Sequence, residues 1–406
     1  MECGIIAGGA HWSFIASLPT YSTTTVRTGL RSLRVNPSAE ARAAAPGNAP
    51  NTDMAIFRVY FYVASNPTGD TFLMGARAAT ANAAGLVFKS SDGQVYAGGS
   101  NGAAAFTFGA TGVTVTTGAW HRADIRVNSA ANPWVVDAQI DGGTALSVSP
   151  AYGASATLRF IVGAVDSATC DIFYDDALGS ATSGDYPLGA GYVISYIPNA
   201  DGTHNIAGAN DFERTLTGTD ITNATTDAVL LIDDRPLESA AGDFINGVAP
   251  PNATDYVEWQ YENNAEATAP RTVEAIFGHH DAGGAGTNNF TVTLRRDATS
   301  DTSNIFSGTT NVGATMTFKR AHFATAPGGA TWTTAIFDDL RSRFLVSDAS
   351  PDPYIDGVML EAEFSGAAPP AAANDPMLRM LMGIGMALAA FLRAASFVPK
   401  SRLAMN

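Results

Sequence analysis

Hydrophobic and polar residues alternate with a period of two in many short segments of the chain, which is typical of β-strands with one buried face. Residues 55–63 give the clearest example, with Phe57, Val59 and Phe61 on one face and Arg58 on the other. Gly, Asn and Asp turns bound these segments, with a spacing of about 8–12 residues. Long helical patterns do not occur before residue 377. The pattern predicts an all-β fold, a sandwich or barrel, and excludes a doubly wound α/β fold.

The order of the segments predicts two tandem antiparallel β-sandwich (jelly-roll) domains plus a C-terminal hydrophobic helix. A short helix is expected within 225–239, and a turn or short helix at 332–340. The expected divisions are a jelly-roll domain at 1–180, a bridging segment at 181–253, a second β-sandwich at 254–365, and a linker with the terminal helix at 366–406.

The C-terminal helix is hydrophobic on all sides. Its apolar run lies between Arg379 and Arg393, which is shorter than the about 20 residues that span a bilayer. We expect it to pack at an oligomer interface or into a neighbouring protein, because large apolar surfaces seek partners. Membrane contact is the disfavoured alternative. The expected interface residues are Met380, Leu381, Ile384, Leu388, Phe391 and Leu392.

The net charge and the number of cysteines limit the kinds of partner and of disulfide bonding that the chain could have. The formal net charge is −15, which argues against nucleic-acid binding because that function needs a basic surface. Cys3 and Cys170 are the two cysteines, too few for a disulfide framework. We expect Cys170 to be a small buried residue within a strand. The N-terminus has no basic region followed by a long apolar stretch, so we expect no secretory signal there.

Several strands of the first domain resemble a known fold. The resemblance is to a concanavalin A-like (laminin-G-like) jelly roll. It rests on the segments 26–29 and 33–35, the strand that opens Trp120-His121-Arg122, the hairpin at 139–142 and the closing strand at 172–176.

The whole arrangement over roughly residues 1–365 resembles virion structural proteins of tailed bacteriophages. The segments that carry this resemblance are 186–193, 198–205, 346–351 and 358–364. It implies a non-enzymatic head (capsid) or tail component, located in the virion. Such a protein would act through contacts with other virion proteins, as a homo-oligomer, and without a cofactor.

The laminin-G-like resemblance also implies a possible Ca²⁺ site at the rim of the jelly roll. Asp141 lies in the predicted hairpin, and Asp175 and Asp176 end the first domain. Carboxylate oxygens suit this hard cation. The alternative is that these aspartates cap turns.

Aromatic residues of the first domain suggest a second function. Tyr60, Tyr62, Trp120 and Trp134 could stack on sugars, although aromatic residues also form the cores and cross-strand pairs of sandwiches. We expect core roles for these four. The alternative is a carbohydrate-binding adhesin, a receptor-binding module at the particle surface that recognises a host-surface glycan.

Two further groups of residues were weighed as sites. Glu361 and Glu363 share one face of a predicted strand at a spacing of about 7 Å, which makes a glycoside hydrolase the weaker alternative function. An exposed, solvated strand face or a subunit contact is the expected role. Residues 279–281, His-His-Asp, could ligate a metal, but adjacent residues of an extended segment point apart, so we expect a loop. We expect no catalytic residues.

Deletion of residues 377–406 should abolish incorporation of the protein into virus particles, because the apolar helix is the expected anchor. Particles assembled with the full-length or the truncated protein would be purified and probed for it. Normal incorporation of the truncated protein would contradict the anchor hypothesis.

Overall fold

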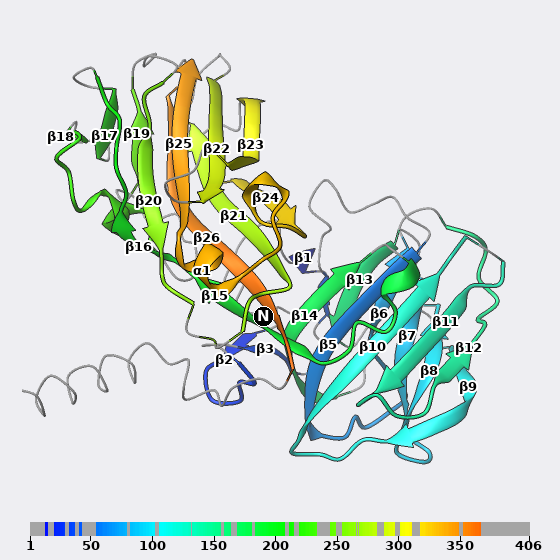
Figure 1. Cartoon of the computed structure of the whole chain (residues 1–406). Helices are drawn as coiled ribbons and strands as arrows, with labels where there is room; N and C mark the ends of the chain where they lie inside the picture. Colours follow the sequence, from blue (N-terminus) through cyan, green and yellow to red (C-terminus); the bar gives the residue numbers. More distant parts are fainter. Residues whose placement is uncertain are drawn as a thin grey trace, which may run out of the picture.

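The alternating segments assemble into two β-sandwiches, which Figure 1 shows as two lobes. The all-β prediction is confirmed. The computed structural model describes residues 13–14, 20–28, 32–36, 40–42, 54–78, 82–101, 105–130, 132–155, 158–163, 169–180, 183–207, 211–214, 219–233, 244–248, 254–264, 266, 268–281, 288–296, 301–310, 317–348 and 352–366.

The first sandwich has two antiparallel sheets of seven strands each. One sheet has the order β1 (Ser13–Phe14), β4 (Glu40–Arg42), β13 (Leu158–Gly163), β6 (Thr71–Ala78), β7 (Ala83–Lys89), β8 (Gln94–Ser100), β9 (Phe106–Thr114). The other has the order β12 (Leu146–Val148), β11 (Val135–Ile140), β10 (Trp120–Asn128), β5 (Met54–Ser65), β14 (Asp171–Ser180), β3 (Ser32–Val35), β2 (Thr20–Ser22). Neighbouring strands are often distant in sequence, as in a jelly roll.

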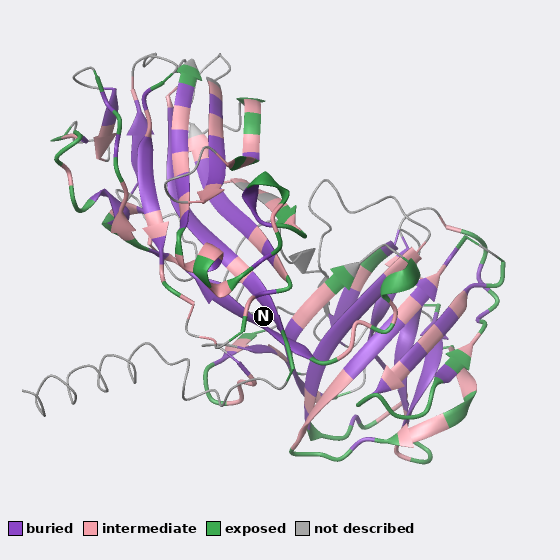
Figure 2. Ribbon diagram, viewed as in Figure 1, coloured by how far each residue is buried: buried purple, intermediate pink, exposed green. Residues whose placement is uncertain are grey.

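Strand β5 forms the centre of the second sheet, between β10 and β14. Its residues Phe57, Val59 and Phe61 are buried in the core between the sheets, as the alternation predicts. Figure 2 shows buried residues along the central strands of both sandwiches. The outward residues of β5 are Arg58, Tyr60 and Tyr62, and they are used by the junction and by the candidate site.

The second sandwich also has two antiparallel sheets. One has the order β18 (Thr219–Asp220), β17 (Phe212–Arg214), β19 (Ile245–Gly247), β26 (Pro353–Ser365), β21 (Thr272–Asp281), β24 (Thr317–Phe323), and β15 (Gly191–Tyr196) also pairs with β26. The other has the order β16 (Pro198–Asp201), β20 (Val257–Tyr261), β25 (Leu340–Asp348), β22 (Asn288–Arg296), β23 (Thr302–Thr310).

The segment expected to bridge the domains contributes strands β15 to β19 to the second sandwich. In β15, the side chains of Tyr192, Ile194 and Tyr196 enter the core of that sandwich. Strand β15 pairs with β26, which lies far along the chain. The local pattern therefore predicts a strand at 192–198 without showing which sheet receives it.

Helices are short in the described residues. They are η1 (Ser183–Asp185), η3 (Ala228–Leu231), η4 (Pro327–Gly329) and α1 (Thr334–Asp338). Both η3 and α1 lie where the sequence predicts short helices. The side chain of Thr333 caps α1 by accepting a hydrogen bond from the amide of Ile336 at 3.1 Å. No helix in the described ranges is long and apolar enough to cross a membrane.

A buried ion pair joins the two sandwiches. Arg58 of β5 is fully buried, and its Nη1 donates to Oε1 of Glu363 in β26 at 2.9 Å. Arg271 also forms an ion pair with Glu363 from the second sandwich itself. A Cβ on Gly191 would lie 2.4 Å from Nη1 of Arg58 and 2.6 Å from a backbone oxygen of β26, so a side chain at this position would force the junction apart.

A second set of contacts at the junction involves the end of β14. The amide of Val193 in β15 donates to Oδ1 of Asp176 at 2.7 Å, and the hydroxyl of Thr28 donates to the same oxygen at 2.6 Å. Arg27 forms an ion pair with Asp176. Its guanidinium lies over the ring of Tyr60, 3.3 Å from the centroid. Charged groups therefore hold β5 and β14 against β15 and β26.

Replacement of Glu363 by Gln should lower the free energy of unfolding by about 3–5 kcal/mol, because the guanidinium of Arg58 then stays buried without an anion. Calorimetric unfolding of both proteins would measure the loss. Lys89→Gln is the control, since Lys89 and Asp92 form an exposed pair worth less than about 1 kcal/mol. Equal effects of the two substitutions would contradict the assignment of the junction.

Candidate functional site

Four residues from neighbouring strands form a row across the outer face of the sheet that contains β5. Trp120 of β10 pairs with Tyr62 of β5, Tyr62 pairs with Phe173 of β14, and Phe173 pairs with Arg34 of β3. Residues that pair in register share a face of the sheet. We call Trp120, Tyr62, Phe173 and Arg34 the aromatic row.

The rings of the aromatic row contact one another. The ring centroids of Tyr62 and Trp120 lie 5.6 Å apart, and those of Tyr62 and Phe173 lie 5.8 Å apart in an edge-to-face arrangement. The guanidinium of Arg34 lies 5.3 Å from the centroid of Phe173. Two hydrogen bonds of 2.8 and 2.9 Å hold Arg34 against Asp171. The row is therefore an ordered surface that ends in an ion pair.

The four aromatic residues that could stack on sugars differ in how far they are buried. Trp134 is fully buried and donates from Nε1 to a backbone oxygen at 2.7 Å, and Tyr60 is buried beneath Arg27. For these two, the expected burial is confirmed. Trp120 and Tyr62 are half-buried on the outer face, outside the core. Sequence reasoning did not find Phe173, although its alternation with the core residues Ile172 and Tyr174 places it outward.

The structure does not bring the three predicted Ca²⁺ ligands together. Asp141 lies beside Arg122, which pairs with Tyr60, and Tyr60 pairs with Asp175. Two strands thus separate Asp141 from Asp175, a distance of roughly 14 Å at the usual strand spacing. One ion cannot bind both carboxylates. No cluster of metal-ligating side chains occurs among the described residues.

Asp141 lies in the turn between β11 and β12, directly after Ile140. Its backbone is left-handed, with a φ of 56°, as tight hairpin turns require. Its carboxylate accepts the amide of Arg122 at 2.7 Å and lies 2.7 Å from Nδ1 of His121. This contact raises the pKa of His121. The contacts match the turn-capping alternative.

Asp175 and Asp176 are fully buried at the junction. Burial raises the pKa of Asp175 to about 6, and the neighbouring charge of Asp176 adds to this rise. The amide of Arg27 donates to Asp175 at 2.9 Å. The protein groups around both carboxylates therefore serve the junction, and Ca²⁺ binding there stays a prediction.

The strand face of Glu361 and Glu363 carries a third acid from the neighbouring strand. Glu274 of β21 pairs with Glu361 of β26, which places their Cβ atoms about 5 Å apart. Burial raises the pKa of Glu274 to about 8, and the charge of Glu361 adds to this rise. A protonated acid beside a second carboxyl could serve glycoside hydrolysis, so that function stays a prediction. Glu363 is buried in the junction, so the expectation of a solvated strand face is wrong for this residue.

The prediction of a loop at His279 and His280 is wrong, because both residues lie in β21. The ring of His279 is fully buried among Phe277, Phe290 and Phe306, and burial lowers its pKa to about 3. His280 points away and lies 2.8 Å from Asp356 through Nδ1. The two rings therefore do not converge, as their adjacent positions predict.

Two other expectations concern cysteine and the C-terminus. Cys170 is buried in the core of the first sandwich, as expected, but it lies directly before β14 and not within a strand. Cys3 and the six expected interface residues between Met380 and Leu392 lie outside the described residues, so the anchor hypothesis stays a prediction.

Comparisons with known proteins give faint likenesses. No protein-family model and no curated protein matches the chain. The tandem CBM22-1–CBM22-2 domain of Paenibacillus barcinonensis Xyn10C is 10% identical, with a TM-score of 0.24, over 88% of this chain and 94% of its own. The binding domain of botulinum neurotoxin serotype D is 10% identical, with a TM-score of 0.29, over 69% and 71%.

A GH131 beta-glucanase catalytic domain from Podospora anserina is 12% identical, with a TM-score of 0.26, over 45% of this chain and 87% of its own. TM-scores at this level carry no argument about fold or function.

Glu274→Gln should flatten the dependence of stability on pH. The folded pKa of Glu274 is about 8 against an ordinary value of 4.5, so the folded state holds the proton more tightly than the unfolded state. The stability from this proton is fully present below about pH 4.5 and is lost as the pH rises through about 8. Melting temperatures at about pH 5 and about pH 8 would measure the loss in both proteins.

Glu361→Gln is the companion variant to Glu274→Gln. It removes the facing charge, so the loss of stability at about pH 8 should also be smaller in this variant. Identical pH slopes in the three proteins would show that the two carboxyls do not interact.

Proposed function

We propose that the chain is a non-enzymatic carbohydrate-binding protein whose first sandwich holds a sugar chain on the aromatic row. A sugar ring has an apolar C–H face and a polar rim, which suits a surface of aromatic rings bordered by charged groups. Trp120 and Tyr62 provide the aromatic rings, and Arg34 with Asp171 provides the charged groups.

The observation that carries the proposal is the position of Trp120 and Tyr62. Large aromatic side chains contribute most when they are buried, yet these two stand half-buried on the outer face of a sheet whose inner face is filled. The buried ring of Phe173 packs edge to face against Tyr62, and Tyr62 in turn contacts Trp120. Preformed aromatic surfaces with a few fixed polar groups are typical of ligand sites.

The geometry suits an extended ligand. Trp120, Tyr62 and Phe173 come from three adjacent strands, and Arg34 comes from a fourth. At the usual strand spacing the row spans roughly 14 Å. A short oligosaccharide laid across the strands would contact the half-buried rings of Trp120 and Tyr62, pass over the buried Phe173 and reach the ion pair of Arg34 at the end.

The sequence resemblance favours the surface of a tailed bacteriophage as the setting of this function. There the protein would combine a structural role with recognition of a host-surface glycan. The ordered, half-buried aromatic row on the outer face supports the recognition role beside the structural one.

Trp120→Ala and Tyr62→Ala should each weaken binding of a neutral oligosaccharide by about tenfold, because each removes one stacking surface. A glycan array identifies the bound sugar, with and without Ca²⁺, and calorimetric titration of that sugar measures the affinity. Thermal unfolding checks that each variant folds.

The matched control for these two variants is Phe108→Ala. Phe108 lies in β9 of the opposite sheet and contacts Tyr96 and Phe106. The Phe108→Ala variant therefore loses similar aromatic contacts at a position away from the aromatic row. Unchanged binding in the row variants, or an equal loss in the control, would refute the site.

A further inference from the structure

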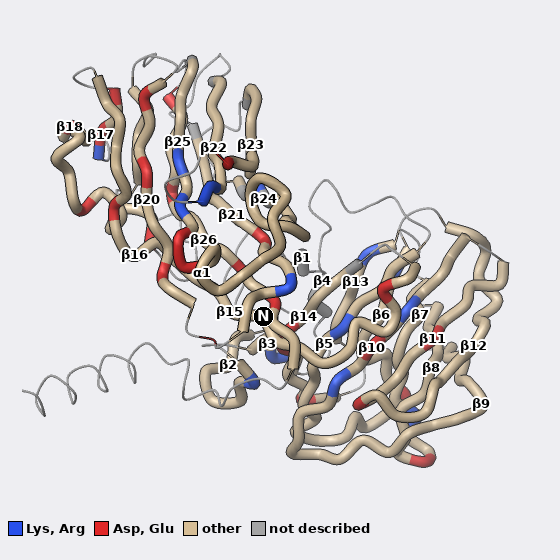
Figure 3. Tube along the Cα trace, viewed as in Figure 1, with Lys and Arg blue, Asp and Glu red and all other residues tan. Residues whose placement is uncertain are grey.

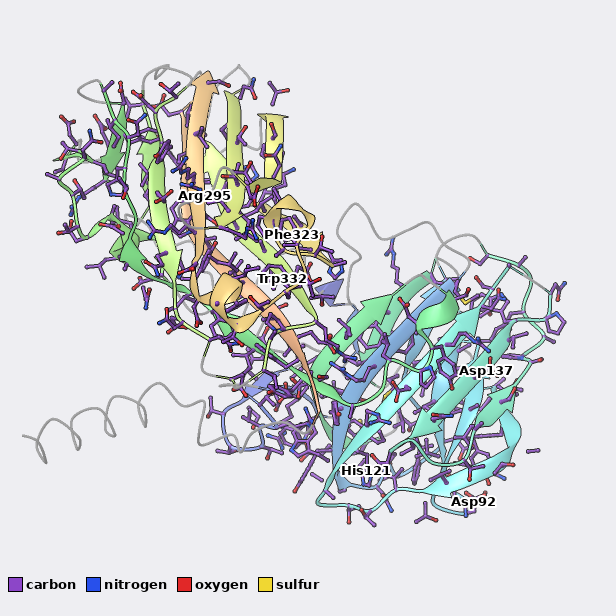
Figure 4. All side chains as sticks on the ribbon, in the orientation of Figure 1. Asp92, His121, Asp137, Arg295, Phe323 and Trp332 are labelled. Atoms are coloured by element: carbon purple, nitrogen blue, oxygen red, sulfur yellow. The ribbon has the colours of Figure 1, made fainter. Side chains whose placement is uncertain are left out.

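Three arginines of the second sandwich converge on one carboxylate. Glu258 lies in β20, Arg341 and Arg343 lie in β25, and Arg295 lies in β22. Glu258 pairs with Arg343, and Arg341 pairs with Arg295, so the four side chains share the outer face of their sheet. Figure 3 shows the basic positions gathered on β25 and β22, and Figure 4 labels Arg295. We call these four residues the arginine group.

Glu258 organises the arginine group from its centre. Its side chain is 1% exposed. Oε2 accepts from Nη1 of Arg295 at 2.8 Å and from Nε of Arg343 at 2.6 Å, and Oε1 accepts from Nη1 of Arg341 at 3.1 Å. The amide of Thr203 also donates to Oε1 at 3.0 Å. Both oxygens are therefore fully engaged, and the positions of the guanidiniums are fixed.

Arg343 is held in a way that leaves its outer edge available. Its Nε contacts Glu258, and its guanidinium carbon lies 3.7 Å from the ring centroid of Tyr256. Within the described part of the chain, its two Nη groups make no hydrogen bond, and the side chain is 22% exposed. A planar guanidinium fixed on one edge and one face presents a fork that matches a carboxylate.

A second observation points to a ligand at this position. Thr293 of β22 pairs with Arg343, so the two side chains are neighbours on the outer face. Thr293 is 8% exposed, and its Oγ1 is buried without a hydrogen-bond partner among the described residues. A buried hydroxyl without a partner is uncommon and calls for an explanation. A ligand oxygen beside Arg343 would supply the partner.

We propose that the arginine group binds the carboxylate of an acidic saccharide, with Arg343 as the fork and Thr293 as the neighbouring donor. This inference rests on the proposed carbohydrate-binding function and names a second, separate subsite. It gives the protein a preference for sugars that carry a carboxylate.

The charge of the protein favours a small anionic group over an extended polyanion. The chain carries a formal net charge of −15, so a nucleic acid reaching beyond the arginine group would meet repulsion from the surrounding surface. One carboxylate on an otherwise neutral sugar meets only the local positive field.

The test uses the full chain and matched pairs of acidic and neutral sugars. Titration calorimetry at near-physiological salt compares trigalacturonate with its methyl ester, and sialyllactose with lactose. The two pairs distinguish a uronate from a sialate as the source of the carboxylate. We expect one acidic sugar to bind at least about tenfold more tightly than its neutral counterpart, the value of one charge-assisted bidentate contact.

Two variants locate this preference. Arg343→Lys keeps the charge but loses the planar fork, so the tenfold preference should disappear. Thr293→Val keeps the shape and removes the hydroxyl, so acidic-sugar binding should weaken several-fold. Arg126→Lys is the control, because Arg126 forms an ion pair on the first sandwich with Asp137 and should leave the preference intact.

The outcomes separate this inference from the proposed function. Trp120→Ala should leave the Arg343-dependent binding of the acidic sugar unchanged while it weakens binding of the neutral sugar. Arg343-dependent binding of the acidic sugar without any effect of the aromatic-row variants would support the arginine subsite and refute the row. Equal binding of acidic and neutral sugars would overturn the inference, as would an unchanged preference in Arg343→Lys. Arg343-dependent binding of a short single-stranded DNA, with no preference between the sugars, would also overturn it.

Discussion

The ion pair of Arg58 and Glu363 is the constraint on which the rest of the structure depends. A guanidinium that is fully removed from water needs an anion in contact, and Glu363 is its carboxylate partner among the described residues. Nε and Nη2 of Arg58 are buried without a hydrogen-bond partner among the described residues. The carboxylate of Glu363 therefore compensates the charge of the buried guanidinium. The central strand of the first sandwich is therefore fixed against the last described strand of the second. Gly191 makes this approach possible.

Much of the fold follows from alternation, and the exceptions have physical causes. In β26, strict alternation puts Val358, Leu360 and Phe364 on one face, and all three are fully buried in the core. The same alternation would put Ile355 on the opposite face and Asp356 in the core, but Ile355 enters the core and Asp356 contacts His280. A bulge in the pairing of β21 with β26 lies between these positions and reverses the alternation. A local sequence pattern does not show such a shift.

The candidate site depends more on pairing between strands than on sequence-local features. Tyr60 and Tyr62 both point away from the core of the first sandwich, but Arg27 covers Tyr60 while Tyr62 is half-buried. The local sequence does not show that Arg27 lies over Tyr60. The separation of Asp141 from Asp175 follows from the strand order, which composition does not reveal. Likewise, Glu258 and Arg343 are 85 residues apart in the chain, so their contact emerges only when β20 pairs with β25.

The position of the junction partners has a consequence for biosynthesis. Arg58 and Glu363 are separated by 305 residues, and domains tend to fold in order as the chain leaves the ribosome. The first sandwich can complete its core before β26 has been translated, with Arg58 still in contact with water at its edge. Withdrawal of this charge from water must await the closing strand of the second sandwich. The ion pair at the junction can therefore form only when nearly the whole described chain has been made.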